Sequence, residues 1–299
     1  MINLFTTYYN EKNPERAEEL RTCLINNSKL KSLNNIYTLS EIGEDEFLLE
    51  NNINVIRIFE RPTFNDFFRA TNAFTSTNDI NIIANADIYF DKSLNCLTKV
   101  NLSNSCFALT RWDVWKNGRA RLTEISGSQD CWIFKGKINN VDGNFHLGIP
   151  GCDNRLAHEI KKAGYNLFNP SISIRAYHLH QSAYRPNSNK WFSKDYAIGR
   201  PHATVIPDTL ESFNKSSIFT LLMHKKKLSD YLYKLKIQRW YNYKICITKY
   251  NQNLANGNSY NRLSKIRLLI LKYYFRIPVT KYMLMIFSPV YYKKYLDRR

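Results

Sequence analysis

The chain has 299 residues, 44% of them hydrophobic, which is enough to bury the core of one large α/β domain or of two modest ones. Its formal net charge is +18, from 43 Lys and Arg against 25 Asp and Glu. The six cysteines are scattered and form no Cys-x-x-Cys pair, which argues against a zinc knuckle and against a disulfide framework.

The positive charge is confined to one end of the chain. Residues 1–214 hold 24 Lys and Arg against 23 Asp and Glu, whereas residues 215–299 hold 19 against two. The sequence therefore predicts a near-neutral globular domain over 1–214 and a separate basic region over 215–299.

The N-terminal residues lack a basic stretch followed by a long apolar one, so we expect no signal peptide. The chain has no uninterrupted apolar run of about 18 residues, so we expect no spanning helix. Together with the scattered cysteines, this predicts a cytoplasmic protein.

Short apolar segments alternate with capped helices in the first part of the chain. Asn13 and Pro14 have the residue types of a helix start, and Thr63 with Asp66 has the pattern of a second one. Strands are predicted over 2–7, 35–39, 53–59 and 80–91. This alternation predicts an α/β fold with a mostly parallel central sheet flanked by helices.

The strand predicted over 80–91 carries polar residues where its apolar run ends, Asn85 and Asp87. In extended geometry these two side chains share a face. A carboxylate at the carboxyl end of a buried strand faces the crevice where open α/β sheets bind ligands, and two oxygen side chains suit a divalent cation carrying phosphates. The alternative is a strand followed by an ordinary polar turn.

The second part of the domain adds strands over 106–110 and 128–134, separated by a polar loop or hairpin over 116–127. A helix is predicted from Cys152 to Gly164 with Asp153 in its first turn. A last strand over 172–180 carries His178 and His180, two apart and therefore on one face.

The order of these motifs resembles the GT-A nucleotide-sugar glycosyltransferases, and within them the family-2-like bacterial polysaccharide enzymes. Asn85-Ala86-Asp87 is similar to a variant of the Asp-x-Asp signature, with Asn first. Cys152-Asp153 stands where that family has an acidic pair, before a helix that ends in Ala-Gly-Tyr. The resemblance covers roughly residues 1–181.

The resemblance implies a GT-A-like sheet and a bound Mn²⁺ or Mg²⁺. Asp87 would hold the metal, with His178 or His180 completing the site. Asp153 would be the general base of an inverting reaction, and Asp130 is the second candidate for the base or a ligand of the donor sugar.

The same resemblance implies contacts to a nucleoside-diphosphate sugar. The base would lie at the end of the first strand, Asn85 would orient the metal or contact the ribose, and other side chains would hold the diphosphate and sugar. These candidates are Thr6, Thr7, Tyr8, Arg69, Asn85, Asp87 and Trp132. Plain structural roles remain open for several of them: a surface charge for Arg69, core packing for Trp132, a strand end for the histidines and a helix cap for Asp153.

The basic region over 215–299 interleaves Lys and Arg with Tyr, Trp, Leu and Ile, as in Leu268–Leu271 and Met283–Phe287. Such a segment suits an anionic membrane surface, a nucleic acid, or packing as a helical appendage. Its high aliphatic content favours the membrane surface, so we expect a helical region lying on the inner face of the membrane and no nucleic-acid partner.

The sequence thus predicts a metal-assisted glycosyltransferase that extends a lipid-linked saccharide during synthesis of a surface polysaccharide, such as lipopolysaccharide or capsule. A sugar-phosphate nucleotidyltransferase is one alternative, although no Gly-rich loop with Arg or Lys follows the first strand. A nucleic-acid-binding protein built on the basic region is the other.

Overall fold

The computed structural model describes residues 1–42, 45–123, 128–179, 182, 201–205 and 207–210. The chain divides into two units, Met1–Val205 and Ile206–Arg299, and the elements below belong to the first. The predicted basic region over 215–299, its membrane contact and His180 lie outside the described residues. Within the described ranges, no helix is long and apolar enough to cross a membrane.

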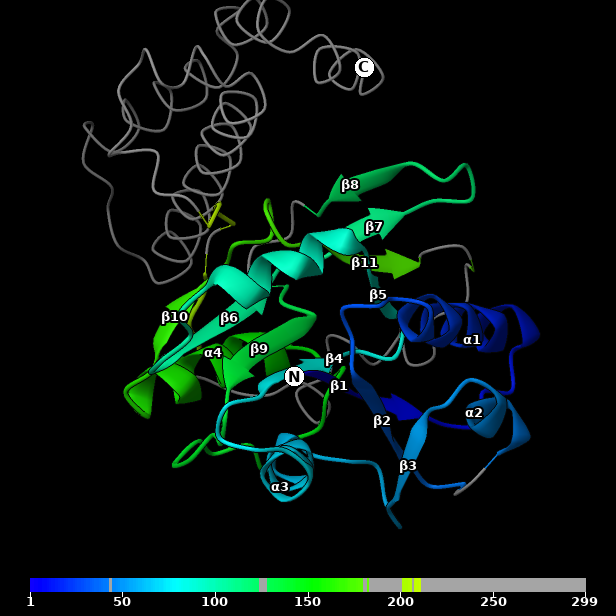
Figure 1. Ribbon diagram of the computed structural model, residues 1–299, viewed down its shortest axis with the longest axis horizontal. Helices are drawn as coiled ribbons and strands as arrows, with labels where there is room; N and C mark the ends of the chain where they lie inside the picture. Colours follow the sequence, from blue (N-terminus) through cyan, green and yellow to red (C-terminus); the bar gives the residue numbers. More distant parts are fainter. Residues whose placement is uncertain (43–44, 124–127, 180–181, 183–200, 206, 211–299) are drawn as a thin grey trace, which may run out of the picture. The chain divides into compact units, whose positions relative to one another are not determined.

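A seven-stranded sheet with the order β10-β6-β9-β4-β1-β2-β3 forms the centre of the first unit (Figure 1). Its strands are β1 (Ile2–Tyr8), β2 (Asn35–Ser40), β3 (Asn54–Arg57), β4 (Ile80–Ala84), β6 (Ser105–Leu109), β9 (Cys131–Lys135) and β10 (Asn166–Phe168). Neighbouring strands are parallel except at β9, which is antiparallel to both β4 and β6. The predicted mostly parallel sheet is confirmed, and β9 starts where β4 ends, with Cys131 opposite Ala84.

A second, four-stranded sheet continues from the carboxyl ends of the first (Figure 1). It has the order β5-β11-β7-β8, and the chain enters it from β4 into β5 (Ile88–Phe90) and from β6 into β7 (Trp112–Val114). The polar stretch after β7 is a hairpin, because β8 (Ala120–Leu122) pairs with β7 in antiparallel fashion. β11 (Ala176–Leu179) lies between β5 and β7, so the last strand returns to the ends of β4 and β6.

The helices begin where the sequence predicts. In α1 (Pro14–Ser28) the Asn13 side chain accepts a hydrogen bond from the Arg16 backbone N at 3.0 Å. In α3 (Phe64–Phe74) the Asp66 carboxylate accepts from the Thr63 backbone N at 2.7 Å. α4 (Cys152–Lys162) follows Gly151, whose φ of 84° is in the left-handed region that glycine adopts most readily. The short α2 (Glu46–Glu50), the 3₁₀ helix Lys92–Lys99 and β10 were not predicted.

The main core lies between the sheet and α3 with α4. Phe5 of β1, Phe64 and Phe67 of α3, Trp132 of β9 and Leu156 of α4 are each at most 1% exposed and belong to one cluster. On α1, Cys23 packs with Val114 and Leu179 of the small sheet. The large sheet therefore packs against α3 and α4, and the small sheet packs against α1.

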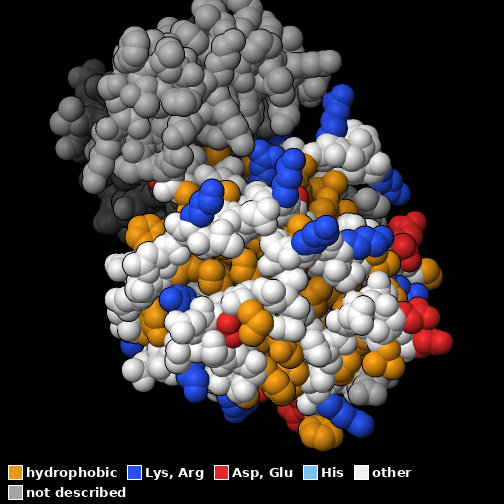
Figure 2. Space-filling view, in the orientation of Figure 1, with side chains coloured by type: hydrophobic (Ala, Val, Ile, Leu, Met, Phe, Trp, Pro, Cys, Tyr) orange, Lys and Arg blue, Asp and Glu red, His pale blue; other side chains and the backbone are white. Residues whose placement is uncertain are grey.

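The surface charges of this unit are mixed in sign. On the face shown in Figure 2, acidic side chains gather beside α1 and α2 and basic ones over the β7–β8 hairpin. Glu15, Glu18 and Glu46 are exposed on the two helices, and Lys116 and Arg119 on the hairpin. This mixture agrees with the nearly balanced composition of residues 1–214.

Candidate active site at the carboxyl ends of the strands

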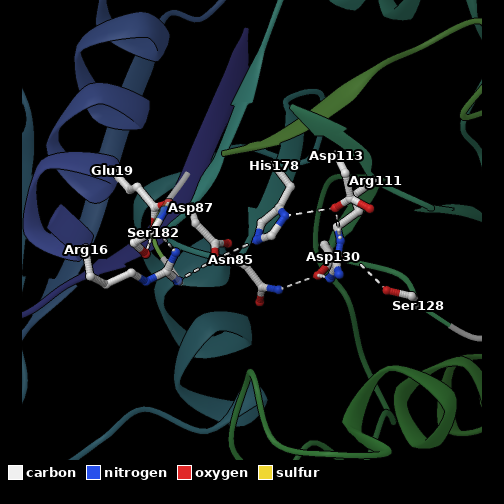
Figure 3. A network of polar contacts seen from close by, with 10 residues as sticks. All are labelled: Arg16, Glu19, Asn85, Asp87, Arg111, Asp113, Ser128, Asp130, His178 and Ser182. Atoms are coloured by element: carbon white, nitrogen blue, oxygen red, sulfur yellow. Dashed lines mark hydrogen bonds and ion pairs between the residues drawn. The ribbon is translucent and has the colours of Figure 1, made fainter. Parts of the chain in front are cut away.

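A network of charged and amide side chains lies where β4, β6 and β11 end and β9 begins (Figure 3). Its members come from positions far apart in the chain and are joined by hydrogen bonds and ion pairs. They are Arg16, Glu19, Asn85, Asp87, Arg111, Asp113, Ser128, Asp130, His178 and Ser182. Asn85, Asp87, Asp130 and His178 were predicted as site residues, and the structure brings these four together.

The backbone at Asn85–Asp87 is a turn, and the expected extended geometry was wrong. β4 ends at Ala84, and the backbone N of Ile88 donates to the carbonyl of Asn85 at 3.1 Å. The turn sends the two side chains to different partners. Asn85 Nδ2 donates to Asp130 Oδ1 at 2.8 Å, whereas Asp87 faces α1 and β11.

Asp87 is an ionised carboxylate held by two cationic partners. Its Oδ2 accepts from Arg16 Nη2 at 2.5 Å and lies 3.1 Å from His178 Nε2. Burial alone would raise the pKa of Asp87, but the charges of His178 and Arg16 outweigh burial and hold the pKa well below its ordinary value.

His178 lies between two carboxylates and is 4% exposed. Its Nδ1 is 3.0 Å from Asp113 Oδ1, and its Nε2 is 3.1 Å from Asp87 Oδ2. A neutral imidazole has one N–H, so one carboxylate would face a lone pair. Burial lowers the pKa of His178, but Asp87 and Asp113 outweigh it and raise the pKa to about 9. The gap between His178 and Asp87 must therefore hold either a proton or another cation.

Arg111 joins the two halves of the network. Its Nε donates to Asp113 Oδ1 at 2.8 Å and its Nη1 to Asp130 Oδ1 at 3.0 Å. Burial lowers the pKa of Arg111, but the two carboxylates outweigh burial and raise it further, so the guanidinium stays charged. Asp113 is consequently fixed by Arg111 on one side and orients His178 on the other.

The two predicted base candidates, Asp130 and Asp153, have different surroundings. Asp130 is 3% exposed and accepts hydrogen bonds from Asn85, Arg111 and Ser128. Asp153 stands in the first turn of α4, where Cys152 Sγ donates to its Oδ1 at 3.3 Å. Burial and the negative charge of Asp130 raise the pKa of Asp153 well above its ordinary value. A carboxyl group with a raised pKa is suited to accepting a proton near neutral pH.

The predicted alternative for Asp153, a helix cap, does not describe its position. Gly151 is the N-cap residue of α4, and no side chain caps this helix end. The Asp153 carboxylate also accepts from the backbone N–H of Gln129, which ties α4 to the segment that carries Asp130.

Two buried acceptor oxygens of the site, Asn85 Oδ1 and Asp87 Oδ1, have no hydrogen-bond partner among the described residues. Carboxylate and amide oxygens are the ligands of hard divalent cations, and neighbouring ligands of an octahedral ion with bonds of about 2.1 Å lie roughly 3.0 Å apart. The 3.1 Å between His178 Nε2 and Asp87 Oδ2 fits that spacing.

The ligand set on the chain is incomplete by itself. The described part of the chain holds no group of three or more His, Cys, Asp or Glu side chains placed to bind a metal. A partial set of one carboxylate and a few weaker donors is the arrangement in which Mg²⁺ binds together with substrate phosphates. The residues present therefore fit a divalent cation that arrives with, or is completed by, a phosphate ligand.

A cavity of about 320 Å³ opens at the carboxyl end of β1. Tyr8, Tyr9, Ala17, Leu20 and Ile42 contribute to its wall, with Glu11, Arg21 and Asp45 among the charged groups. The predicted nucleotide residue Tyr8 lines this cavity, whereas Thr6 is buried within β1 and Thr7 is partly buried there. Its volume is at the lower end of the range for small-molecule sites, and two tyrosines contribute to its lining.

The structure places the remaining predicted residues away from this network. Arg69 lies on the exposed side of α3, where its guanidinium pairs with Asp66. Trp132 is 1% exposed and packs in the main core. These are the plain structural roles that the sequence also allowed for both residues.

Sequence reasoning assigned no role to the other six residues of the network, which are Arg16, Glu19, Arg111, Asp113, Ser128 and Ser182. Arg111 and Asp113 are two apart at a strand start, a spacing that places both side chains on one face and could have indicated a pair. No local pattern pointed to Arg16, whose partner Asp87 is 71 positions away.

Comparisons with known proteins return distant structural likenesses. No protein-family model matches the chain, and no curated protein matches it. A crystal structure of GalNAc-T7 with UDP, GalNAc and Mn²⁺ is 10% identical, with a TM-score of 0.40, over 62% of this chain and 45% of that one. The mannosyltransferase PcManGT from Pyrobaculum calidifontis, in complex with GDP-Man and Mn²⁺, is 12% identical, with a TM-score of 0.42, over 64% and 59%.

A third similar structure is a 4-diphosphocytidyl-2C-methyl-D-erythritol synthase from Anaerococcus prevotii, at 12% identity and a TM-score of 0.34, over 61% of this chain and 89% of that one. The chain thus spans less than two thirds of the length of the first two structures. These identities and TM-scores are too low to assign a family or an activity. What the site binds has to follow from its own side chains.

Proposed function

We propose that the chain is a glycosyltransferase that takes a sugar from a nucleoside-diphosphate sugar with the help of a divalent cation. The observation that carries this proposal is a pair of oxygens beside His178 at the end of β4, Asn85 Oδ1 and Asp87 Oδ1, for which the described residues offer no hydrogen-bond donor. A cation bound there would lie near a nucleoside-sized cavity at the end of β1, the strand that pairs with β4.

Asp87 and His178, with Asn85, would hold Mn²⁺ or Mg²⁺. The cation supplies charge stabilisation to the departing diphosphate. Asp113 would keep the His178 ring oriented through Nδ1, because a ligating histidine usually donates its second ring N–H to a carboxylate.

The nucleoside would occupy the cavity at the end of β1, with Tyr8 at its wall and Thr6 and Thr7 below it in the strand. Glycosyl transfer then needs the acceptor hydroxyl to lose its proton. Asp153 would take that proton as the hydroxyl oxygen attacks the anomeric carbon, while the bond from this carbon to the diphosphate oxygen breaks. The raised pKa of Asp153 suits this role in an inverting reaction.

Asp130 would act as a positioning residue. The three donors that it binds fix its orientation, and through Asn85 it sets the direction of the free Oδ1. Its charge also contributes to the raised pKa of Asp153. Asp130 and Asp153 would therefore have different roles because their hydrogen-bond partners and surrounding charges differ.

The acceptor is proposed from the composition of the C-terminal region. A basic segment with bulky aliphatic side chains, 19 Lys and Arg within residues 215–299, suits an anionic membrane surface. A lipid-linked saccharide, extended at the inner face of the membrane during synthesis of a surface polysaccharide such as lipopolysaccharide or capsule, would require such contact.

The proposal can be tested by thermal unfolding of the protein with nucleoside diphosphates and nucleotide sugars, with and without Mn²⁺. A ligand at 100 times its Kd stabilises the fold by about 2.7 kcal/mol. We expect one nucleotide to stabilise the wild type in the presence of Mn²⁺. Asp87→Asn should lose that stabilisation, and Asp153→Asn should retain it while losing sugar transfer.

The matched control is Asp79→Asn, which removes the charge from a partly buried ion pair between Asp79 and the N-terminal amine of Met1. It lies at the opposite end of β4, so its nucleotide response should equal that of the wild type. If no nucleotide stabilises the folded wild type, with or without Mn²⁺, the proposed function is wrong.

A further inference from the structure

Arg16 occupies a position between the cavity and the proposed cation site. It stands in the first turn of α1, is 9% exposed, and binds Asp87 through Nη2 at 2.5 Å and Glu19 through Nη1 at 2.7 Å (Figure 3). The next residue, Ala17, lines the cavity, as does Leu20 one turn further along the helix. The guanidinium therefore lies beside the path from the cavity to Asp87.

Tyr9 provides a second link between the cavity and Arg16. Tyr9 lines the cavity, and its hydroxyl hydrogen-bonds with the Arg16 side chain. Burial raises the pKa of Tyr9 while the neighbouring positive charge of Arg16 acts against it. A nucleotide whose base fills the cavity and whose phosphates reach Asp87 has to pass the Arg16 guanidinium.

One hydrogen-bond donor of Arg16, its buried Nε, is not used within the described part of the chain. The acceptor Asp87 Oδ1 also has no hydrogen-bond partner among the described residues. An unpartnered donor and unpartnered acceptors in one place are not satisfied by a simple anion or by a simple cation. They fit a ligand that brings both, such as a divalent cation with a diphosphate.

We propose that Arg16 is a diphosphate-binding residue that exchanges partners when the nucleotide sugar binds. In the free protein its positive charge pairs with Asp87. In the complex Asp87 turns to the cation, and the freed donors of Arg16 hold an oxygen of the diphosphate. This proposal rests on the proposed function and adds a specific residue for the leaving group.

Charge balance favours this exchange in a buried site. The cation brings two positive charges and the diphosphate ester brings two negative ones, so the two ligands together add no net charge to the network, and His178 gives up its Nε2 proton to the solvent when the cation binds. Glu19 keeps Arg16 anchored throughout, because it is itself fixed by the backbone N and the hydroxyl of Ser182 at 2.6 and 3.0 Å. The positive end of the α1 dipole adds to the attraction for an anion at this position.

Arg16→Gln in the full chain tests the exchange, because its two expected effects have opposite signs. Titration calorimetry with inorganic pyrophosphate and Mg²⁺ should show affinity weakened about tenfold or more, since a charged hydrogen-bond donor is lost. Electron paramagnetic resonance with Mn²⁺ alone should show tighter binding, because Asp87 is no longer neutralised by Arg16. A purely structural role would weaken both or neither.

Two further variants keep the test decisive. Arg16→Lys keeps the charge without the planar fork, so pyrophosphate should bind more weakly than to wild type and Mn²⁺ should bind equally. Asp79→Asn, which loses a partly buried ion pair at the other end of β4, should change neither affinity. If Arg16→Gln does not fold, Arg16→Lys carries the test alone, and wild-type pyrophosphate affinity in that variant overturns the role of Arg16.

The failure of this inference is distinguishable from failure of the proposed function. A wild type that binds nucleotide and transfers sugar, together with a folded Arg16→Gln variant that binds pyrophosphate and Mn²⁺ like wild type, overturns the role of Arg16 alone. A wild type that binds neither pyrophosphate nor any nucleoside diphosphate in the presence of Mg²⁺ overturns both.

Discussion

Asp113 Oδ1 lies 3.0 Å from His178 Nδ1, although the two residues are 65 positions apart in the chain. The pair forms because β7 and β11 are parallel neighbours in which Asp113 stands opposite His178. Arg111 holds the same Asp113 oxygen from the other side, so the carboxylate has little freedom to leave the ring. The orientation of His178 Nε2 toward Asp87 is thus set by a residue that would not touch a metal itself.

Asp113→Asn should weaken metal binding without abolishing the fold. The amide cannot accept the ring N–H as strongly, and loss of such an outer partner costs about 10–100-fold in metal affinity. Mn²⁺ titration followed by electron paramagnetic resonance measures this loss, and activity should return at higher Mn²⁺. Asp91→Asn is the matched control, because Asp91 binds Tyr177 of the same strand and not His178. Unchanged Mn²⁺ affinity in Asp113→Asn would contradict the positioning role.

Asp153→Asn should remove activity and raise stability at neutral pH. The folded pKa of Asp153 lies above the unfolded value of about 3.9, so the native state binds more protons between the two values and stability falls as pH rises through that window. The amide has no charge to bury and escapes this penalty. The melting temperature at pH 7 should therefore increase by about 2–4 °C per kcal/mol recovered, and the gain should vanish near pH 4.

The matched control for that measurement is Asp142→Asn, whose carboxylate is largely exposed. Its stability should remain within about 0.5 kcal/mol of wild type at both pH values. A melting temperature of Asp153→Asn at pH 7 that equals or falls below that of wild type would show that the Asp153 charge is not penalised in the fold. Transfer activity should drop by about 10²–10⁴-fold if Asp153 is the base.

Asp130→Asn should move the acid limb of the pH–activity profile to lower pH. The negative charge of Asp130 contributes to the raised pKa of Asp153, and its removal leaves the opposing charge of Arg111. A base with a lower pKa stays deprotonated in more acidic solution. The measurement is kcat/KM for transfer against pH, and a limb that does not move would assign it to a group other than Asp153.

The parts of the fold that depend on near neighbours in sequence were predictable. The starts of α1 and α3 follow from Asn13, Pro14, Thr63 and Asp66, whose capping bonds span at most three positions. The place of Asp87 at a strand end followed from the apolar run that stops before it, whereas Asp130 precedes its strand and reaches the same edge because β9 is antiparallel to β4. Position along a strand is a local property, so Asp87 could be placed at the carboxyl edge of the sheet, and the place of Asp130 could not be predicted.

The ion pairs of the site depend on tertiary neighbours and could not be predicted in this way. Arg16 and Asp87 meet because β5, which follows Asp87, packs against α1. The turn at Asn85 was also missed, because an apolar strand that continues into Ile88 has the same pattern as an uninterrupted one. Trp132 illustrates the same limit, since only the packing of β9 places its ring in the core.

Ala17→Phe should separate recognition of the nucleoside from recognition of the diphosphate. Ala17 lines the cavity at the end of β1, so a phenyl ring there occupies the volume proposed for the base. Nucleoside diphosphates should then bind no more tightly than inorganic pyrophosphate, while pyrophosphate with Mg²⁺ binds as it does to wild type. Glu18→Phe places the same ring on the exposed side of α1 and should leave both affinities unchanged.

Titration calorimetry measures the two ligands side by side, and nucleoside diphosphates that still bind Ala17→Phe more tightly than pyrophosphate would place the base elsewhere. Comparing the two ligands is necessary because Ala17, which lines the cavity, and Arg16 are adjacent on α1. A variant that disturbs α1 as a whole would weaken both ligands, whereas a filled cavity removes only the contribution of the base.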